Sequence, residues 1–588
     1  MALLLAVASI LGRDRVAGLN ADVSRPGCPR GPAAQRGRSR NILFRRRTKA
    51  PMRLALLAIL CAVTSAAAPN VLFVLLDDLG YGDLRAYGNP YVDTPHIDSL
   101  VRSGVLLTHH YAPSPLCAPA RAGFLTGRYN HRTGAVDVSS NRGIDRIAPS
   151  EKTFGDYFRH AGYTTALIGK WHNGLYNADV LPHRRGFDLF FGFPNGAQDY
   201  WRWNLMRNGV YDKPDGRYLP DVFSDETIRL IRDRQGPPFA IFLAHNAIHD
   251  PFQAPQELVE KYERRVRFRY GRTVATIYAM IEALDAGLGR IFAALKREGV
   301  WDETIIVVTS DNGAILNRRA DLDASTYRFH AGLSGNKGEV LEQGIRVPAV
   351  ASWPGNFPAG LVVDAPIHGC DWLPTLFHAT AVDSPPGAKP LDGWNVMPLL
   401  RGEEMPELSN RILPFQKNRY TPVRHSDAAI RKGRWKLYWP GLRPTMAKDG
   451  PRDNPSYRRG ITKKHWEMPL DPDIPDFPNA RGEPPRLFDL ILDPGETTDL
   501  AGRYPEVVRD LNRRYDAWFD DVIAEWRQAN RLIREADRRY WRDRKSPDPR
   551  VLFKDFWMWD QVDASPEEDD PLEVFSGFWS RERTRKPR

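Results

Sequence analysis

The sequence predicts an α/β fold with a large, mostly parallel central sheet flanked by helices. Its 588 residues exceed one ordinary domain and can bury a sizeable core. Residues 70–76, 238–244 and 304–308 are uninterrupted apolar runs, as expected of strands that are covered on both faces. Residues 273–296 carry apolar side chains at helical spacing and Gly299 follows them, so this segment is predicted to be a long covering helix.

The amino-terminal segment is typical of an export signal. In residues 52–68 a basic residue precedes the apolar run 54–63, and an alanine triplet ending at Ala68 offers an A-x-A-type cleavage site. The apolar run is too short to span a bilayer. Residues 1–51 are rich in arginine and proline, and we expect them to be either upstream sequence outside the native protein or a disordered leader. The protein is therefore expected to be exported, periplasmic or secreted, without a stable membrane anchor and with a mature chain that begins near Pro69.

The distribution of charge argues against a nucleic-acid partner. The formal net charge is +11, which would suggest a polyanion partner if it were spread over the chain. Residues 1–68 contain 12 basic and 2 acidic residues, a net charge of +10, and the remaining 71 basic and 70 acidic residues give a net charge of +1. The body of the protein is thus nearly neutral.

Acidic and amide side chains follow two of the predicted strands. Asp77 and Asp78 come directly after the first strand, and Asp311 and Asn312 follow the strand at 304–308. The carboxyl ends of parallel strands share one edge of a sheet, where ligands bind. Adjacent carboxylates at such a buried edge are costly without a cation, and a hard metal ion prefers oxygen ligands. A metal site is therefore predicted at this edge; the alternative is a solvated loop that carries two acids.

A reactive cysteine is predicted at the start of a short helix. The run Cys117-Ala118-Pro119-Ala120-Arg121 places a proline where the first helical turn tolerates it and an arginine one turn beyond the cysteine. The free N–H groups of that turn and the guanidinium would together form an anion site. The alternative is a buried structural cysteine beside a surface arginine, which is the usual outcome for a single cysteine.

Lysine and histidine side chains follow two further apolar runs. Lys170 and His172 come after residues 164–168 and lie on one side of the chain if that segment is extended. His245 and His249 follow the apolar run that ends at residue 244. For Lys170 or His172 alone, an exposed lysine or a structural histidine is the simpler interpretation, but their position after an apolar strand favours a functional role. For His245, a structural role and a position facing a substrate agree equally well with the sequence.

Taken together, these segments resemble the type I sulfatases, a family in which the cysteine of a C-x-P-S/A-R motif is oxidised after translation to formylglycine. The resemblance extends over about residues 69–530 and departs from the family pattern at Asn173, where leucine is common, and at Gln343, where glycine is usual. The matching segments are CAPAR followed by LTGR at 125–128, GKWHNG at 169–174, HDPF at 249–252, GNKG at 335–338 and EQGIRVP at 342–348. The resemblance implies an alkaline phosphatase-like fold with a smaller antiparallel-sheet subdomain at the carboxyl end.

The resemblance also implies the residues of the site. One calcium ion would be held by side chains at the sheet edge and by formylglycine, which a maturation enzyme forms from Cys117; these metal ligands are Asp77, Asp78, Cys117, Asp311 and Asn312. The implied catalytic residues are Cys117, Arg121, Lys170, His172, His249 and Lys337.

The roles that the resemblance implies divide among these side chains. Hydrated formylglycine would attack sulfur, and His249 would protonate the leaving alcohol oxygen. His172 would act as the base that releases sulfate. Lys337 would bind the sulfate group, while Arg121 and Lys170 would hold the hydrate.

The same resemblance divides the chain into a catalytic domain at 69–420, a carboxy-terminal subdomain at 421–531 and an extension at 532–588. Short antiparallel strands are expected at 429–438 and near 487–490, with an amphipathic helix at 504–531. The extension lies outside the family pattern, and its aromatic content favours packing on the core through Trp541, Phe556, Trp557 and Trp559 over disorder.

Two other features of the chain are interpreted through the resemblance. Cys28 and Cys61 lie in the amino-terminal segment, and Cys117 is reserved for oxidation, so Cys370 is expected to be a buried free thiol. The insertion at 314–333 is expected to form part of the rim of the site through Arg318, Arg319 and Arg328.

The predicted function is that of a sulfuric ester hydrolase acting on a sulfated carbohydrate or an aryl sulfate. Two alternatives are a phosphonate monoester hydrolase or phosphodiesterase of the same superfamily and an inactive homologue that binds sulfated glycans. The sequence does not identify the organic part of the substrate. Trp201 and Trp203 are candidates for stacking on sugar rings, with core packing as the alternative.

Overall fold

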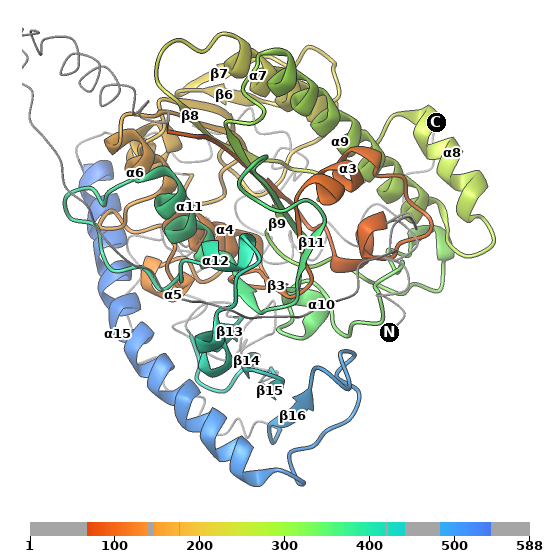
Figure 1. Ribbon diagram of the computed structural model, residues 1–588, viewed down its shortest axis with the longest axis vertical. Helices are drawn as coiled ribbons and strands as arrows, with labels where there is room; N and C mark the ends of the chain where they lie inside the picture. The colour runs from red at the N-terminus through yellow and green to blue at the C-terminus, as the bar shows by residue number, and fades with distance from the viewer. Residues whose placement is uncertain (1–67, 139–145, 176, 418–421, 442–482, 543–588) are drawn as a thin grey trace, which may run out of the picture. The chain divides into compact units, whose positions relative to one another are not determined.

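The computed structural model describes residues 68–138, 146–175, 177–417, 422–441 and 483–542. The predictions for the leader and signal peptide up to residue 67, and for the side chains of Trp541, Phe556, Trp557 and Trp559, lie outside what the structure describes. The described chain is organised around a ten-stranded sheet with the strand order β11-β2-β10-β9-β1-β8-β4-β5-β6-β7 (Figure 1). Its strands are β1 (Asn70–Leu76), β2 (Val105–Leu107), β4 (Thr164–Lys170), β5 (Leu189–Phe193), β6 (Leu205–Arg207), β7 (Val210–Asp212), β8 (Phe239–Ala244), β9 (Thr304–Ser310), β10 (Ala349–Ser352) and β11 (Leu361–Val363).

The centre of this sheet is parallel, as the apolar runs predict. β1 pairs in parallel with β8 on one side and with β9 on the other, and β4 pairs in parallel with β8 and with β5. β10 runs antiparallel to β9 and β2, and β6 and β7 form an antiparallel edge next to β5. The carboxyl ends of β1, β4, β8 and β9 therefore meet at one edge of the sheet.

Both faces of the sheet are covered, because alternate residues of each strand enter different cores. Leu72, Val74 and Leu76 of β1 belong to the core that includes α3, α7, α8 and α9. Val71, Phe73 and Leu75 belong to the core that includes α4, α6, α11 and α12 (Figure 1). The helices are α3 (Pro95–Ser103), α4 (Cys117–Thr126), α5 (Asn130–Thr133), α6 (Phe154–His160), α7 (Leu219–Arg232), α8 (Gln256–Val266), α9 (Arg272–Arg297), α10 (Glu342–Ile345), α11 (Trp372–Thr380), α12 (Met397–Leu400) and α15 (Pro505–Arg542).

The predicted long covering helix is confirmed as α9, which extends the predicted bounds by one residue at each end. Seventeen of its residues are buried, as expected of a helix that packs against the sheet and against neighbouring helices. Within the described residues, no helix is both long enough and apolar enough to cross a bilayer.

A second, four-stranded antiparallel sheet confirms the predicted carboxy-terminal strands but begins earlier than expected. Its strands, in spatial order, are β13 (Ile412–Gln416), β14 (Ala428–Lys432), β15 (Trp435–Trp439) and β16 (Arg486–Asp489). Since β13 pairs with β14, the sheet spans the boundary predicted at residue 421.

The predicted amphipathic helix is α15, and it also crosses a predicted boundary. It continues past residue 531 to Arg542, into the segment assigned to the extension. Its apolar side chains, including Leu511, Tyr515 and Val522, pack on Ile430 and Leu437 of the small sheet. Figure 1 shows α15 passing this sheet, and the helix also contacts α5.

Candidate active site

The predicted helix at Cys117 is confirmed as α4, which begins at Cys117 and is buried along its whole length. Leu116 precedes it in an extended conformation, and Pro119 lies in the first turn, where its missing N–H breaks no helical hydrogen bond. Gly127 ends the helix with φ +65°, a conformation that glycine adopts without strain. Cys117 is 3% exposed. Its thiol faces the carboxyl edge of the sheet, where the sulfur lies within 4.8 Å of a carboxylate oxygen of Asp77 and a ring nitrogen of His249.

Three carboxylates from two strand ends converge beside this helix. Asp77 and Asp78 follow β1, Asp311 follows β9, and carboxylate oxygens of all three lie within 4.8 Å of one another. All three side chains are buried. Burial and the neighbouring Asp77 raise the pKa of Asp311 to about 8, so this edge of the sheet favours a positive charge.

Each carboxylate is paired with a different cation from a distant part of the chain. Lys170 Nζ lies 2.7 Å from Asp77 Oδ2, and Lys337 Nζ lies 2.6 Å from Asp78 Oδ1. Arg121 donates through Nε to Asp311 Oδ2 at 2.8 Å. Burial by itself would raise the pKa of Asp77, but Lys170, His249 and Arg121 outweigh it and hold the pKa below its ordinary value. The cluster is therefore a buried network of three carboxyl groups and three basic side chains.

His249 borders the cluster with one ring nitrogen facing the carboxylates. Its Nδ1 lies 2.6 Å from the carbonyl oxygen of Asp250, which can only accept, so Nδ1 carries a proton. Nε2 lies 3.9 Å from Asp78 Oδ2. Burial and Lys337 lower the pKa of His249, but the carboxylates of Asp250 and Asp78 outweigh them and the pKa lies above its ordinary value. Nε2 is thus placed to give a proton to a group bound at the cluster.

The segment with His172 is anchored to α4 but does not continue the alternation of β4. Arg121 donates to the carbonyl oxygen of Lys170 at 3.1 Å, and Asn173 donates to that of Ala118 at 2.9 Å. An extended segment would place Lys170 and His172 on the same side of the chain. His172 has φ +55° and is not extended, so this expectation does not hold. Its Nε2 lies 3.3 Å from the carbonyl oxygen of Val138.

His245 is part of the core. It is 1% exposed, packs edge-on against Phe223, and accepts through Nδ1 from the backbone N–H of Ala247 at 3.0 Å. Burial lowers its pKa to about 3, so it stays neutral. These contacts favour the structural alternative that the sequence left open for this residue.

A divalent cation with oxygen ligands fits the residues at the sheet edge. Oδ1 of Asp77 and Oδ1 of Asn312 are buried acceptors with no hydrogen-bond donor in the part of the chain that the structure describes. Asn312 also donates to Asp78 Oδ1 at 2.8 Å, which fixes its amide beside the carboxylates. Buried acceptor oxygens without donors are rare and call for a ligand. The donors available there are carboxylate and amide oxygens, which suit a hard cation.

The insertion at 314–333 differs from its predicted role at one arginine. Arg318 and Arg319 are exposed, but Arg328 is 2% exposed and donates to both oxygens of Asp83 at 2.6 Å. The assignment of Arg328 to the rim is therefore wrong. A guanidinium whose planar fork matches one carboxylate can be buried as a pair, which an exposed rim residue does not require.

We expect Arg328→Ala to lower the free energy of unfolding by about 3–5 kcal/mol, because it leaves the Asp83 carboxylate buried without its partner. The matched control is Arg318→Ala, an exposed arginine of the same insertion, which should change stability by no more than about 0.5 kcal/mol. Urea unfolding of both variants measures the difference. Equal effects of the two substitutions would contradict the buried-pair interpretation.

One residue that supports the site has no sequence signal of its own. The hydroxyl of Tyr200 donates to the carbonyl oxygens of Asn246 at 2.9 Å and His249 at 2.8 Å, which holds the loop that carries His249. Tyr200 lies in a run whose tryptophans draw attention first. Only the three-dimensional contact with a loop 46 residues away reveals its role.

Comparisons with known proteins agree with the geometry. The model of the Sulfatase family matches residues 69–382. Arylsulfatase A of Homo sapiens is 30% identical over 507 residues, which cover 78% of this chain and 90% of that protein. Steryl-sulfatase of Mus musculus is 29% identical over 531 residues, which cover 75% of this chain and 80% of that protein. The crystal structure of Ps i-CgsB in complex with k-i-k-neocarrahexaose has a TM-score of 0.63 and 25% identity and covers 83% of this chain and all of that one.

Proposed function

This chain belongs to the sulfatase family and is a sulfatase, and we propose that it removes sulfate from a sulfated carbohydrate, using formylglycine formed from Cys117 and one calcium ion. The observation that carries this proposal is the convergence of Cys117, three carboxylates and three cations at one edge of the sheet. Asn312 completes the proposed metal ligands, with Asp77, Asp78, Asp311 and residue 117. The proposed catalytic residues are Cys117, Arg121, Lys170, His172, His249 and Lys337.

Two chemical groups complete the site. Formylglycine at position 117 supplies an oxygen nucleophile when it is hydrated, whereas a thiolate is a poor ligand for a hard cation. Calcium supplies positive charge that stabilises the oxygens of the sulfate group as charge spreads over them. An unoxidised cysteine fits neither purpose, so we propose that a formylglycine-generating enzyme acts on this chain before it functions.

The side chains of the cluster position and stabilise the sulfate group. Lys337 is 13% exposed at its side chain, whereas Lys170 and Arg121 are almost completely buried. Lys337 can therefore reach a bound sulfate while it still contacts Asp78. Lys170 and Arg121 lie deeper, where they fix the orientation of the carboxylates and of residue 117.

Proton transfer to the leaving group falls to His249. Its Nδ1 proton is committed to the Asp250 carbonyl oxygen. Burial lowers the pKa of His249, but the carboxylates of Asp250 and Asp78 outweigh it and raise the pKa, which favours a second proton on Nε2. The activation free energy for breaking a sulfate ester falls when the leaving alkoxide receives that proton. His172 is proposed as the base for the second step, supported by the anchoring of its segment to α4.

A carbohydrate substrate is supported by two observations. One structure with 25% identity to this chain is in complex with k-i-k-neocarrahexaose. The signal-peptide pattern at 52–68 favours export, where sulfated polysaccharides are found. We propose that the protein is periplasmic or secreted, with a catalytic domain that begins at residue 69 and a carboxy-terminal subdomain that contains the four-stranded sheet and α15.

The test combines mass spectrometry with a substrate panel. We expect the peptide that contains Cys117 to show oxidation of the thiol to an aldehyde after co-expression with a maturation enzyme, and the purified protein to release sulfate from 4-nitrophenyl sulfate and from sulfated oligosaccharides. Phenylphosphonate esters serve as the control for the alternative phosphonate hydrolase. An unmodified thiol and release of phosphonate rather than sulfate would overturn the proposal.

A further inference from the structure

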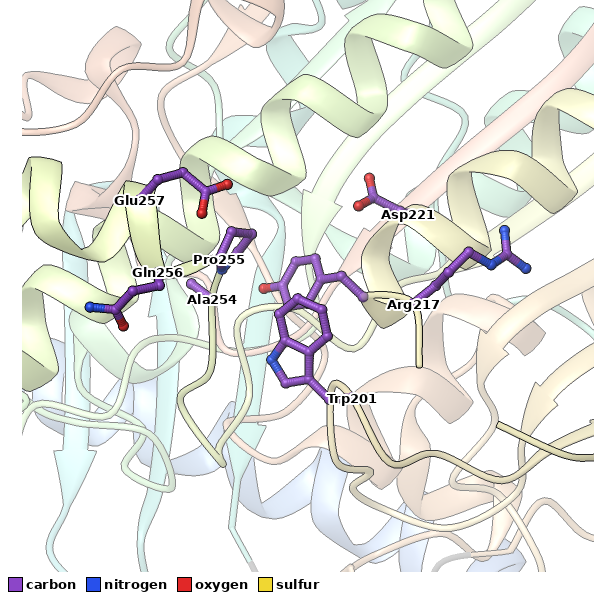
Figure 2. A pocket seen from close by; sticks show the side chains of 8 residues that line it. Trp201, Arg217, Asp221, Ala254, Pro255, Gln256 and Glu257 are labelled. Carbon is purple, nitrogen blue, oxygen red and sulfur yellow. The ribbon is translucent and has the colours of Figure 1, made fainter. Parts of the chain in front are cut away.

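A surface pocket of about 580 Å³ lies apart from the carboxylate cluster. Its walls come from two segments that are distant in sequence. Figure 2 shows Trp201 between residues 254–257 on one side and Arg217 and Asp221 on the other. The pocket therefore combines an aromatic ring with polar groups on opposite walls, the usual composition of a small-molecule site.

The structure separates the two tryptophans that the sequence left undecided. Trp203 is 3% exposed and donates through Nε1 to the carbonyl oxygen of Arg217 at 3.0 Å, so it belongs to the core. Trp201 is 37% exposed and packs on Tyr218, with ring centroids 4.9 Å apart. Its backbone N–H donates to Asp199 Oδ1 at 2.8 Å, which fixes the turn that presents it. A supported but exposed indole is a stacking surface for an apolar ring face.

The pocket is tied directly to the loop that carries His249. Tyr200, next to Trp201, donates to the carbonyl oxygen of His249, and Tyr218 in the pocket donates to that of Gln253 at 2.8 Å. Pro255 in the pocket wall lies six positions after His249, and a segment of that length spans at most about 20 Å. A chain of a few sugar rings can bridge a distance of that order.

The charges of the pocket disfavour a sulfate group. Its ionisable residues are one guanidinium, Arg217, and two carboxylates, Asp221 and Glu257. Arg217 is already paired with Asp215 at 2.7 Å and Asp225 at 3.1 Å, and Asp221 is paired with Arg290 at 2.6 Å. Among the described residues, Glu257 is therefore the charged side chain of the pocket that is left to act on a ligand. Because like charges placed together repel, a sulfated ring would be rejected here. Hydroxyl groups, in contrast, can donate to the carboxylates and accept from the guanidinium or from Gln256.

We propose that this pocket is a subsite for an unsulfated sugar ring of an oligosaccharide whose sulfated ring lies at the Cys117 cluster. Trp201 stacks on the face of the ring, and the polar residues on the two walls bind its hydroxyls. The subsite rests on the proposed function for the identity of its ligand. It makes the enzyme select a sulfation pattern: a sulfate at the cleaved position and none on the ring in the pocket.

The first experiment compares Trp201→Ala with Phe268→Ala in the full, matured protein. Phe268 is 88% exposed and lies outside the pocket. Phe268→Ala therefore removes an exposed aromatic ring without changing the pocket and is the matched control. The probes are 4-nitrophenyl sulfate and tetra- and hexasaccharides from carrageenan, chondroitin sulfate and heparin. We expect Trp201→Ala to lower the ratio of kcat/KM for the preferred oligosaccharide to kcat/KM for 4-nitrophenyl sulfate roughly tenfold, mainly through KM, as loss of one stacking contact implies. Phe268→Ala should leave this ratio unchanged, and an unchanged ratio in both variants would overturn the subsite.

The second experiment tests the charge argument. Partially desulfated oligosaccharides should be preferred over fully sulfated ones of the same length, and Glu257→Gln should reduce that preference because it removes a repelling carboxylate. The matched control is Glu260→Gln, an exposed glutamate of the same helix that does not line the pocket. Equal preference for the fully sulfated chain in the unsubstituted protein would overturn the selection of an unsulfated ring.

Direct binding separates failure of the subsite from failure of the proposed function. Calorimetry with the full-length Cys117→Ala protein and the same oligosaccharides requires no turnover. Binding that weakens roughly tenfold on adding Trp201→Ala supports the subsite even if no sulfate is released. Turnover of 4-nitrophenyl sulfate without binding of any of these oligosaccharides would overturn the subsite and leave the sulfatase function standing.

Discussion

Replacement of Cys117 by alanine should abolish sulfate release while the protein stays folded. The side chain is placed where three carboxylates, three cations and His249 converge, so its loss removes the only group from which we propose the nucleophile to form. Removal of a nucleophile from an assembled site typically lowers kcat on the order of 10⁶-fold, because the remaining groups cannot replace it. Sulfate release from 4-nitrophenyl sulfate measures the effect.

A second buried thiol provides a matched control. Cys370, predicted to be a buried free thiol, is confirmed as one: it is 1% exposed and forms no disulfide within the described residues. Cys370→Ala removes the same atoms and should cost about 1 kcal/mol of stability, but it should retain sulfate release. The two variants should therefore have similar melting temperatures and very different activities. Equal activity of the two variants would contradict the role of Cys117.

The parallel centre of the sheet follows from local signals in the sequence. Residues 71–76 and 305–308 are apolar on both faces, and strands of this kind are expected to lie between two layers of helices. Their following residues, Asp77 and Asp311, must then share an edge, whatever lies between them in sequence. The helix at Cys117 is equally local, because Pro119 and Gly127 fix its start and end.

Other features depend on contacts between distant residues, which local patterns do not contain. Arg328 and Arg318 are the same residue type in one insertion, and only the carboxylate of Asp83, 245 residues away, decides that the first is buried. The pairing of Arg121 with Asp311 has the same character. The helix α15 passes residue 531 because its apolar face continues to find partners, such as Ala529 and Ile533 against Ala148.

Asp311→Asn should remove the response of the protein to calcium. In the unsubstituted protein, a cation that binds the folded state at about one hundred times its Kd adds about 2.7 kcal/mol of stability. We therefore expect calcium to raise the melting temperature and EGTA to reverse the rise. Asn at position 311 lacks the negative charge that the ligand set supplies, and calcium affinity depends on the number of charged ligands. The variant should show no calcium-dependent shift.

The matched control is Asp285→Asn, which also neutralises a buried carboxylate. Asp285 lies on α9 and accepts from the backbone N–H groups of His96 at 3.0 Å and Ile97 at 2.7 Å, away from the cluster. This variant should melt at a lower temperature, because Asp285 caps the first turn of α3 and the substitution weakens those hydrogen bonds. It should keep the full calcium-dependent shift in melting temperature. A full shift in Asp311→Asn, or none in the unsubstituted protein, would contradict the proposed metal site.

The ion pairs between the lysines and the carboxylates of the cluster allow a second measurement, the affinity for a sulfate group with and without calcium. Lys337 and Lys170 lie against Asp78 and Asp77, the same carboxylates that calcium would bind. A bound divalent ion competes with the lysines for those oxygens and leaves their charges available to the sulfate group. Calcium and an unreactive sulfate-bearing ligand should therefore each raise the affinity of the other, as reciprocal coupling requires. In Asp311→Asn, calorimetric titration with inorganic sulfate, which cannot be hydrolysed, should give the same affinity with and without calcium, because the ion that frees the lysines no longer binds.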